Sequence, residues 1–154
     1  MTRRALLLLC LAVPLAAADP ARDAWELLSN AASALAGSDS GSFQSYDNST
    51  SFLSYFDSKM PGYDEIRNDV SALLRTAQAS SSIEPIANEG DAAAREMTVE
   101  WTLNIVLLNP GPTVASTRRK ERVKIRMEKR KKSWVIVSLE PRSFFSPPET
   151  GELR

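Results

Sequence analysis

Residues 95–108 read Arg-Glu-Met-Thr-Val-Glu-Trp-Thr-Leu-Asn-Ile-Val-Leu-Leu, and they carry the longest strand signal in the chain. Every second side chain is apolar, at Met97, Val99, Trp101, Leu103, Ile105 and Leu107. The positions between them are polar up to Asn104, after which Val106 and Leu108 make the end apolar on both faces. Because successive side chains of a strand point to opposite faces, this alternation predicts a strand with one buried face. The remaining sequence should supply what packs on that face.

Two stretches on the N-terminal side predict helices. Residues 19–36 begin with Asp19 as a cap and Pro20 in the first turn, and residues 63–79 carry acidic side chains in the first turn and Arg75 near the end. Each has an apolar face, formed by Ala21, Trp25, Leu28, Ala32 and Leu35 in the first and by Tyr63, Ile66, Val70, Leu73, Leu74 and Ala77 in the second. Between them, Phe43 and Tyr46 suggest a short helical piece that we expect residues 47–50 to interrupt, and aromatic side chains recur at helical spacing in residues 51–58.

After residue 79 the apolar period becomes that of strands. Pro85 predicts an edge position for a short strand at residues 82–87, and residues 117–129 alternate in a second clear strand. Residues 134–139 are apolar at alternate and intervening positions, so their pattern does not decide which face points inward. Turns are expected at residues 88–91, 109–112 and 129–133, and an extended tail against the sheet at residues 144–148. Helices followed by an antiparallel meander define an α+β fold.

The first 18 residues have the three parts of a secretory signal peptide. Arg3 and Arg4 make a basic start, residues 5–13 are apolar, and small residues precede Asp19. We therefore expect export to the periplasm or the extracellular space, with cleavage after Ala18. The apolar run is shorter than the ~20 residues that cross a bilayer, so no stable membrane span is expected after cleavage. The chain then divides into the signal peptide (1–18), one domain (19–148) and a flexible C-terminal tail (149–154).

Cysteine and histidine are nearly absent. The one cysteine, Cys10, lies in the signal peptide, and the chain has no histidine. These absences exclude most transition-metal sites and the nucleophilic systems that pair Ser or Cys with His. We predict no metal and no cofactor.

Charge is distributed unevenly along the chain. Residues 19–94 hold four basic and twelve acidic side chains, whereas residues 95–142 hold twelve basic and five acidic ones. On a strand, Arg122, Lys124 and Arg126 share one face. A solvated outer sheet face is the favoured interpretation, because long charged side chains cover sheet surfaces and protect edges. A docking surface for an acidic partner is the alternative, and the export signal argues against a nucleic acid.

Several features together resemble the nuclear transport factor 2-like superfamily, also called SnoaL-like or cystatin-like α+β cones. They are the two helices, the break at Met60, Pro61 and Gly62 between them, the turn at residues 89–91, the strand at residues 99–103 and the hairpin that ends in residues 132–136. The resemblance covers most of residues 19–147. It implies N-terminal helices packed on a strongly bent antiparallel sheet, a cone-shaped half-barrel with an apolar pocket, and frequent homodimers through the sheet. The superfamily includes small lyases and isomerases as well as binding domains without activity, so the fold does not settle the function.

Pocket candidates under this resemblance are Trp25, Tyr46, Tyr55 and Trp101. A carboxylate in an apolar pocket has a raised pKa and can move a proton. Asp47 and Asp57 lie near the aromatic patch, with Tyr63 also close in sequence, and Glu100 and Asn104 lie on the strand face opposite Trp101. The favoured interpretation is that these Asp side chains cap helices and that the tyrosines fill the edge of the core.

Three hypotheses of function follow, of which the third is a protein that docks an acidic partner on the basic strand face. The first is an exported, non-catalytic module that binds a small apolar ligand or a protein, with no catalytic residues assigned. The second is a small lyase or isomerase that acts on an apolar ligand by Asp/Glu–Tyr acid–base chemistry. The second fails if Trp25, Phe43, Phe52 and Trp101 fill the interior of the cone without a polar group.

Overall fold

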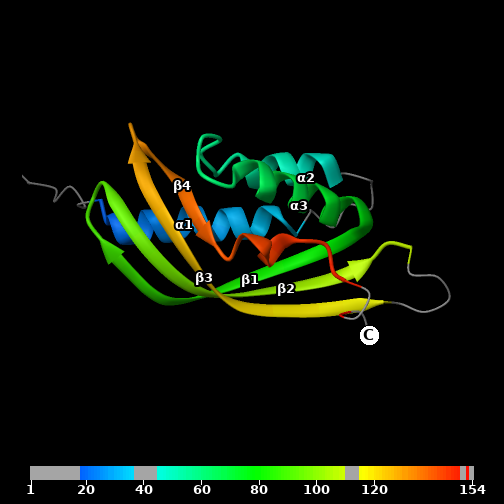
Figure 1. Ribbon diagram of the computed structural model, residues 1–154. Helices are drawn as coiled ribbons and strands as arrows, with labels where there is room; N and C mark the ends of the chain where they lie inside the picture. The colour runs from blue at the N-terminus through cyan, green and yellow to red at the C-terminus, as the bar shows by residue number, and fades with distance from the viewer. Residues whose placement is uncertain (1–17, 37–44, 110–114, 150–151, 153–154) are drawn as a thin grey trace, which may run out of the picture.

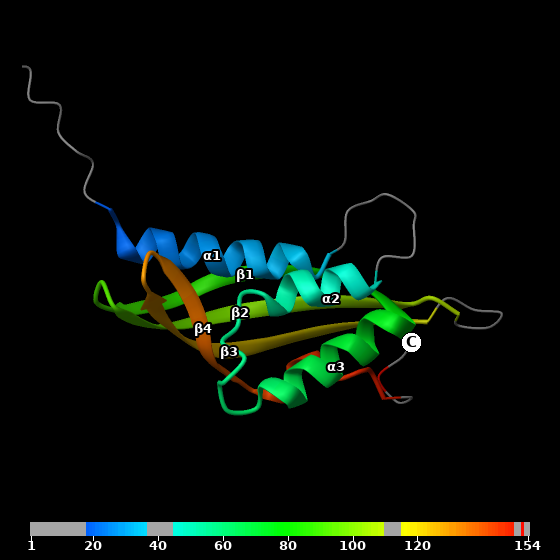
Figure 2. The same cartoon turned by 90° about the horizontal axis from the view of Figure 1, so that it is seen from above.

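Three helices precede a four-stranded antiparallel sheet in the computed structural model, which describes residues 18–36, 45–109, 115–149 and 152 (Figure 1). In chain order the elements are α1 (Pro20–Ala34), α2 (Ser45–Leu53), α3 (Tyr63–Thr76), β1 (Ala77–Gly90), β2 (Ala94–Leu107), β3 (Ser116–Arg130), β4 (Ser133–Glu140) and the 3-10 helix η1 (Arg142–Phe145). The strand order is β1-β2-β3-β4. The sheet is curved and does not close, and the helices lie on its concave side (Figure 1, Figure 2). The predicted α+β class is confirmed.

Strand β2 lies at the centre of the sheet and pairs along its whole length. Its predicted inner face is confirmed, because Met97, Val99, Trp101, Leu103 and Ile105 are all 0% exposed. Strand β1 pairs with it from Ala77–Leu107 to Gly90–Arg95, and β3 pairs with it from Ala94–Glu128 to Val106–Ser116. The strongest strand signal in the sequence is therefore the element to which both neighbours are aligned.

An aromatic cluster fills the space between the helices and the concave face. The ring of Trp101 lies 5.3 Å from that of Phe145 and 5.9 Å from that of Phe144. Phe52 on α2 lies 5.1 Å from Phe145 and 4.9 Å from Phe56. The indole Nε1 of Trp101 donates a 2.7 Å hydrogen bond to Ser81 Oγ on β1, which satisfies its polar atom inside the core.

The first two helices confirm one prediction and correct another. Asp19 caps α1 as expected, because its Oδ1 accepts hydrogen bonds from the backbone of Ala21 and Arg22. Helix α2 is continuous over Ser45–Leu53, so the interruption predicted at residues 47–50 is wrong. Ser49 is buried together with Phe52 and Leu53, three and four positions later, and this shared buried face explains why the helix continues through polar residues.

Strand β1 is longer than predicted. Helix α3 ends at Thr76, whereas the sequence predicted a helix up to residue 79. Strand β1 begins at once with Ala77 and extends to Gly90. Ala77 and Ala79 are buried opposite Leu107 and Ile105 of β2. Pairing along the full length of β2 outweighs the weak strand preference of these small residues. The edge position inferred from Pro85 is confirmed, and the register shifts between Pro85 and Ala87.

The C-terminal segment also differs from the prediction of an extended tail. After β4 the chain forms η1, and Phe144 and Phe145 are buried in the aromatic cluster. Arg119 on β3 fixes this segment, because its Nη1 donates to the backbone oxygens of Phe144 (2.6 Å) and Ser146 (2.9 Å). On β4 itself, Trp134, Ile136 and Leu139 point inward, with a register shift in β3 between Arg126 and Met127.

Several parts of the predicted chain organisation lie outside the described residues. They are residues 1–17 of the predicted signal peptide, Phe43, residues 110–112 of the predicted turn and parts of the C-terminal tail. The side chains of Tyr46 and Asp47 lie outside them too. In the part of the chain that the structure describes, no helix is both long and apolar enough to cross a bilayer.

We predict that Phe145→Ala lowers the free energy of unfolding by about 3–5 kcal/mol, the usual range for removing a buried ring. Phe145 is 0% exposed and contacts three other rings, so its loss leaves a cavity at the centre of the cluster. Urea denaturation measures the change. Ile86→Ala is the matched control, since Ile86 is 48% exposed and should change stability by no more than about 0.5 kcal/mol. Equal effects of the two substitutions would contradict the central position of Phe145.

Candidate functional site

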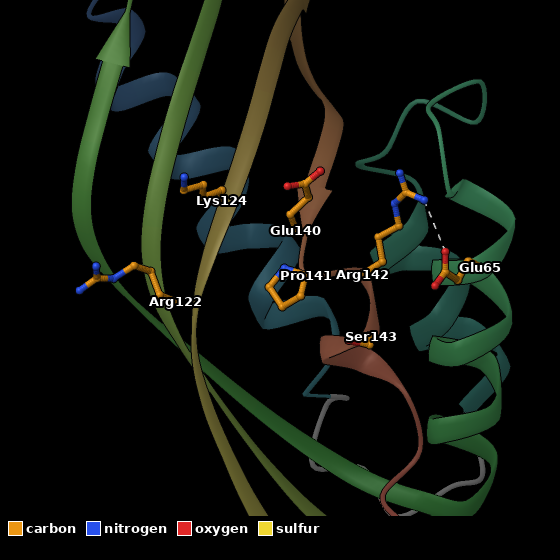
Figure 3. Close-up of a pocket in the computed structure, with 7 residues that line it drawn as sticks. All are labelled: Glu65, Arg122, Lys124, Glu140, Pro141, Arg142 and Ser143. Atoms are coloured by element: carbon orange, nitrogen blue, oxygen red, sulfur yellow. Dashed lines mark ion pairs between the residues drawn. The ribbon is translucent and has the colours of Figure 1, made fainter.

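An open groove of about 590 Å³ lies where β4 leaves the sheet (Figure 3). Its lining comes from α3, β3, the end of β4 and η1, through the residues Glu65, Arg122, Lys124, Glu140, Pro141, Arg142 and Ser143. Strand β4 pairs with β3 only from Arg130 to Lys124, and its last pair is Lys124–Glu140. The chain then turns at Pro141 into η1, so β3 continues past the groove without β4 beside it.

One wall of the groove is built by Arg142. Its side chain crosses directly over Gly62, the residue before α3, and its Nη1 lies 3.6 Å from Glu65 Oε2 on the first turn of that helix (Figure 3). A Cβ at Gly62 would overlap the Arg142 side chain, and Gly62 has φ 79°, where a side chain is strained. The glycine in the predicted break at residues 60–62 therefore both starts α3 and leaves room for Arg142.

The other wall carries two of the three predicted basic-face residues. Arg122 and Lys124 point away from η1 and α3, and neither forms an ion pair within the described residues (Figure 3). Arg126 lies on the same strand face but outside the groove, and its Nη2 is 3.6 Å from Glu128. The groove therefore presents three cations and two carboxylates, of which one cation and one carboxylate already face each other as Arg142 and Glu65.

Three of the four predicted pocket residues have side chains that the structure describes, and these lie in different environments. Trp101 is fully buried in the aromatic cluster, while Trp25 on α1 and Tyr55 after α2 are partly buried against the core. Tyr46 lies in the first turn of α2, and its side chain is outside the described residues. Trp25, Tyr55 and Trp101 do not line the groove.

Two of the carboxylates that sequence analysis considered, Asp57 and Glu100, have structural partners. Asp57 accepts a hydrogen bond from Lys59 N (2.9 Å) and lies 3.6 Å from Arg130, while Glu100 pairs with Lys120 at 2.7 Å. No Asp or Glu of residues 18–36, 48–109, 115–149 or 152 is buried. The buried charge in that part of the chain is Arg95, whose guanidinium donates to Asn88 Oδ1 and to backbone oxygens of the β1–β2 turn.

Asp69 is a carboxyl that sequence analysis did not single out. Partial burial, with the negative charge of Glu65 one turn earlier as a second cause, raises the pKa of Asp69 above its usual value. Raised carboxyl pKa values are common at functional sites, but Asp69 does not line the groove. Its repulsion by Glu65 follows from the (i, i+4) spacing on α3, which is readable from the sequence.

Sequence analysis also missed Glu65, Glu140, Arg142 and Ser143 as lining residues. One signal was available, since Pro141 cannot donate to a strand ladder and so marks the end of β4. In the described ranges, no cluster of three or more Asp, Glu, His or Cys side chains is arranged to hold a metal ion.

The fold matches solved structures. No protein-family profile matches the sequence, and a search of curated proteins found no match. A proposed aromatic ring hydroxylase from Novosphingobium aromaticivorans aligns with a TM-score of 0.62 at 10% identity, over 78% of this chain and 85% of that chain. A proposed calcium/calmodulin-dependent protein kinase II association domain from Xanthomonas campestris gives 0.53 at 16% identity, over 82% and 89%. A proposed polyketide cyclase from Xanthomonas campestris gives 0.51 at 10% identity, over 79% and 90%. Identities this low show a shared fold alone.

We predict that Asp69→Asn raises the free energy of unfolding at about pH 7, because the folded state disfavours the charged form of Asp69. A carboxyl whose pKa is raised on folding stabilises the folded state at pH values below its unfolded-state pKa. This contribution is lost as the pH rises through its folded-state pKa. The gain from the substitution should therefore shrink toward about pH 3, where Asp69 is itself protonated. Urea denaturation at the two pH values measures it.

Asp64→Asn on the same helix is the control for the loss of a negative charge. Asp64 is exposed, lies in the first turn of α3 and pairs with Arg67 at 3.0 Å, so its removal should give no such gain. A loss of stability for Asp69→Asn at neutral pH would contradict the pKa direction.

Proposed function

We propose that this chain is a non-catalytic protein-interaction module of the nuclear transport factor 2-like fold, and that it acts after export from the cytoplasm. The fold itself is compatible with a ligand-binding module or a small enzyme. The proposal therefore rests on the residues of this chain and not on the names of its structural neighbours.

The observation that carries the proposal is the aromatic filling of the concave side. Trp101, Phe52, Phe144 and Phe145 are each no more than 1% exposed, and their rings contact one another. A general acid or base must lie within hydrogen-bond reach of its substrate. No described carboxylate is buried beside these rings, so this part of the chain offers no Asp/Glu–Tyr pair to an enclosed substrate.

The structural neighbours include both classes of function. Two are a proposed hydroxylase and a proposed polyketide cyclase, whereas one is a proposed association domain. The filled interior and the polar, charged outer surface of this chain favour a role of the latter kind. The charges of the outer face are segregated, with Glu96 and Glu100 on β2 beside Arg122 and Arg126 on β3. A second copy docked through the sheet is included in the proposal, since segregated charges can complement each other across a two-fold axis.

The test is native mass spectrometry of the exported protein, isolated gently from its own compartment. We expect a mass that starts at Asp19, a complex with a second protein or a second copy, and no retained small molecule. A stoichiometric small apolar molecule held by the protein would overturn the interaction proposal. A mass that still includes residues 1–18 would overturn the export proposal.

Charge reversal identifies the surface in the same experiment. Lys124→Glu combined with Arg126→Glu should weaken the complex, because both side chains lie on the exposed outer face of β3. Lys131→Glu combined with Lys132→Glu makes the same change of charge in the exposed β3–β4 turn and should leave the complex intact. Equal loss in both variants would point to net charge and not to this face.

A further inference from the structure

Strand β3 extends well beyond its partner β4. Residues 124–130 of β3 lie between β2 and β4, whereas residues 116–123 pair with β2 on one side only. Figure 1 shows β3 continuing at the edge of the sheet beyond the point where β4 turns away, and the groove lies at that point. We call residues 116–123 the free segment of β3.

The backbone of the free segment has unused hydrogen-bonding capacity. Among the described residues, its ladder partners come from β2 alone, and its backbone makes no hydrogen bond to the C-terminal segment. That segment is held through the Arg119 side chain instead. A strand edge with open N–H and C=O groups is a template for an added strand.

The opposite edge of the sheet is less suitable for such pairing. Strand β1 carries Pro85, which has no N–H, and its register shifts between Pro85 and Ala87. The free segment contains no proline, and the register shift of β3 lies between Arg126 and Met127, outside it. The opposite edge is therefore interrupted within its strand, whereas the free segment of β3 is uninterrupted along its whole length.

The outward side chains of the free segment are basic. Arg118, Lys120 and Arg122 alternate along it, and only Lys120 has an ion-pair partner within the described residues, Glu100 on β2. Charged side chains on an edge commonly prevent unwanted pairing. They do so by repelling like charge, however, and an acidic strand would meet attraction at the same positions. Directly opposed side chains in an antiparallel pair lie only about 5 Å apart at Cβ, so opposite charges there stabilise the pair.

The groove leaves space beside one end of the free segment, at Arg122. Its volume of about 590 Å³ lies directly beyond the last pair of β4, with Arg122 and Lys124 on one wall. Glu140 opposes an acidic ligand at this end, while Glu65 is partly neutralised by Arg142 at 3.6 Å. The most favourable positions for acidic side chains are therefore opposite Arg118 and Arg122, away from Glu140.

We propose that the free segment of β3 binds an extended acidic segment of a partner protein, which adds to the sheet as an antiparallel strand in line with β4. Backbone hydrogen bonds supply the affinity, and alternate carboxylates opposite Arg118 and Arg122 supply the selectivity. This inference rests on the proposed interaction function and names the place and the chemistry of the partner.

The test uses a fluorescein-labelled peptide of sequence Glu-Thr-Glu-Val-Glu-Thr-Glu and fluorescence anisotropy with the protein that begins at Asp19. We expect saturable binding that weakens as salt rises. Two control peptides separate the contributions. One keeps all the charges but has alternate backbone amides N-methylated, which blocks strand pairing, and the other replaces each Glu by Lys. Neither should bind.

A matched pair of protein variants locates the site. Arg118→Glu combined with Arg122→Glu should weaken peptide binding by about tenfold or more, since two attractive cross-strand pairs become repulsive. Lys131→Glu combined with Lys132→Glu should bind the peptide as the unmodified protein does.

Equal binding of the N-methylated peptide would overturn strand addition, and so would equal loss in the two variants or the absence of any saturable binding. These outcomes leave the interaction function standing if native mass spectrometry still shows a protein complex. A retained small molecule in that experiment would instead remove the premise.

Discussion

The burial of Trp101 on the inner face of β2 is the constraint on which the rest of the structure depends. Its position pairs with Ile83 on β1 and with Glu121 on β3, and its ring meets Phe144 and Phe145 from η1. Because strand side chains alternate, a slip of one residue in β2 would turn this ring to solvent and expose the whole apolar row. Both neighbouring registers and the docking of the C-terminal segment are therefore fixed by the same face.

The sequence predicted those elements whose signal is local and periodic. The alternation in β2 and in the second half of β3, the Asp19 cap and the edge position of Pro85 each follow from a few neighbouring residues. The start of β1 could not be predicted in this way, because Ala77 and Ala79 fit a helix face as well as a strand face. Only their pairing with Leu107 and Ile105, far along the chain, decides between the two.

The candidate site shows the same division. Local alternation predicted that Arg122, Lys124 and Arg126 share a face, and two of them line the groove. The opposite wall could not be predicted, since Glu65 and Arg142 are brought together by the packing of η1 against α3, and no short pattern records that contact. Likewise, the pairing of Lys120 with Glu100 depends on the register between β2 and β3, which the separate strand patterns leave undetermined.

The filled interior and the open edge have one cause. The chain leaves the sheet after Glu140, and within a few residues it places Phe144 and Phe145 against Trp101. Had β4 continued along β3, it would have covered residues 116–123, and these two rings would have lain on the sheet instead of inside it. The segment that fills the space available to a small ligand is thus the segment whose departure leaves the basic stretch of β3 unpaired. In this chain, filling the concave side and leaving residues 116–123 of β3 without a β4 partner are two consequences of the same turn at Pro141.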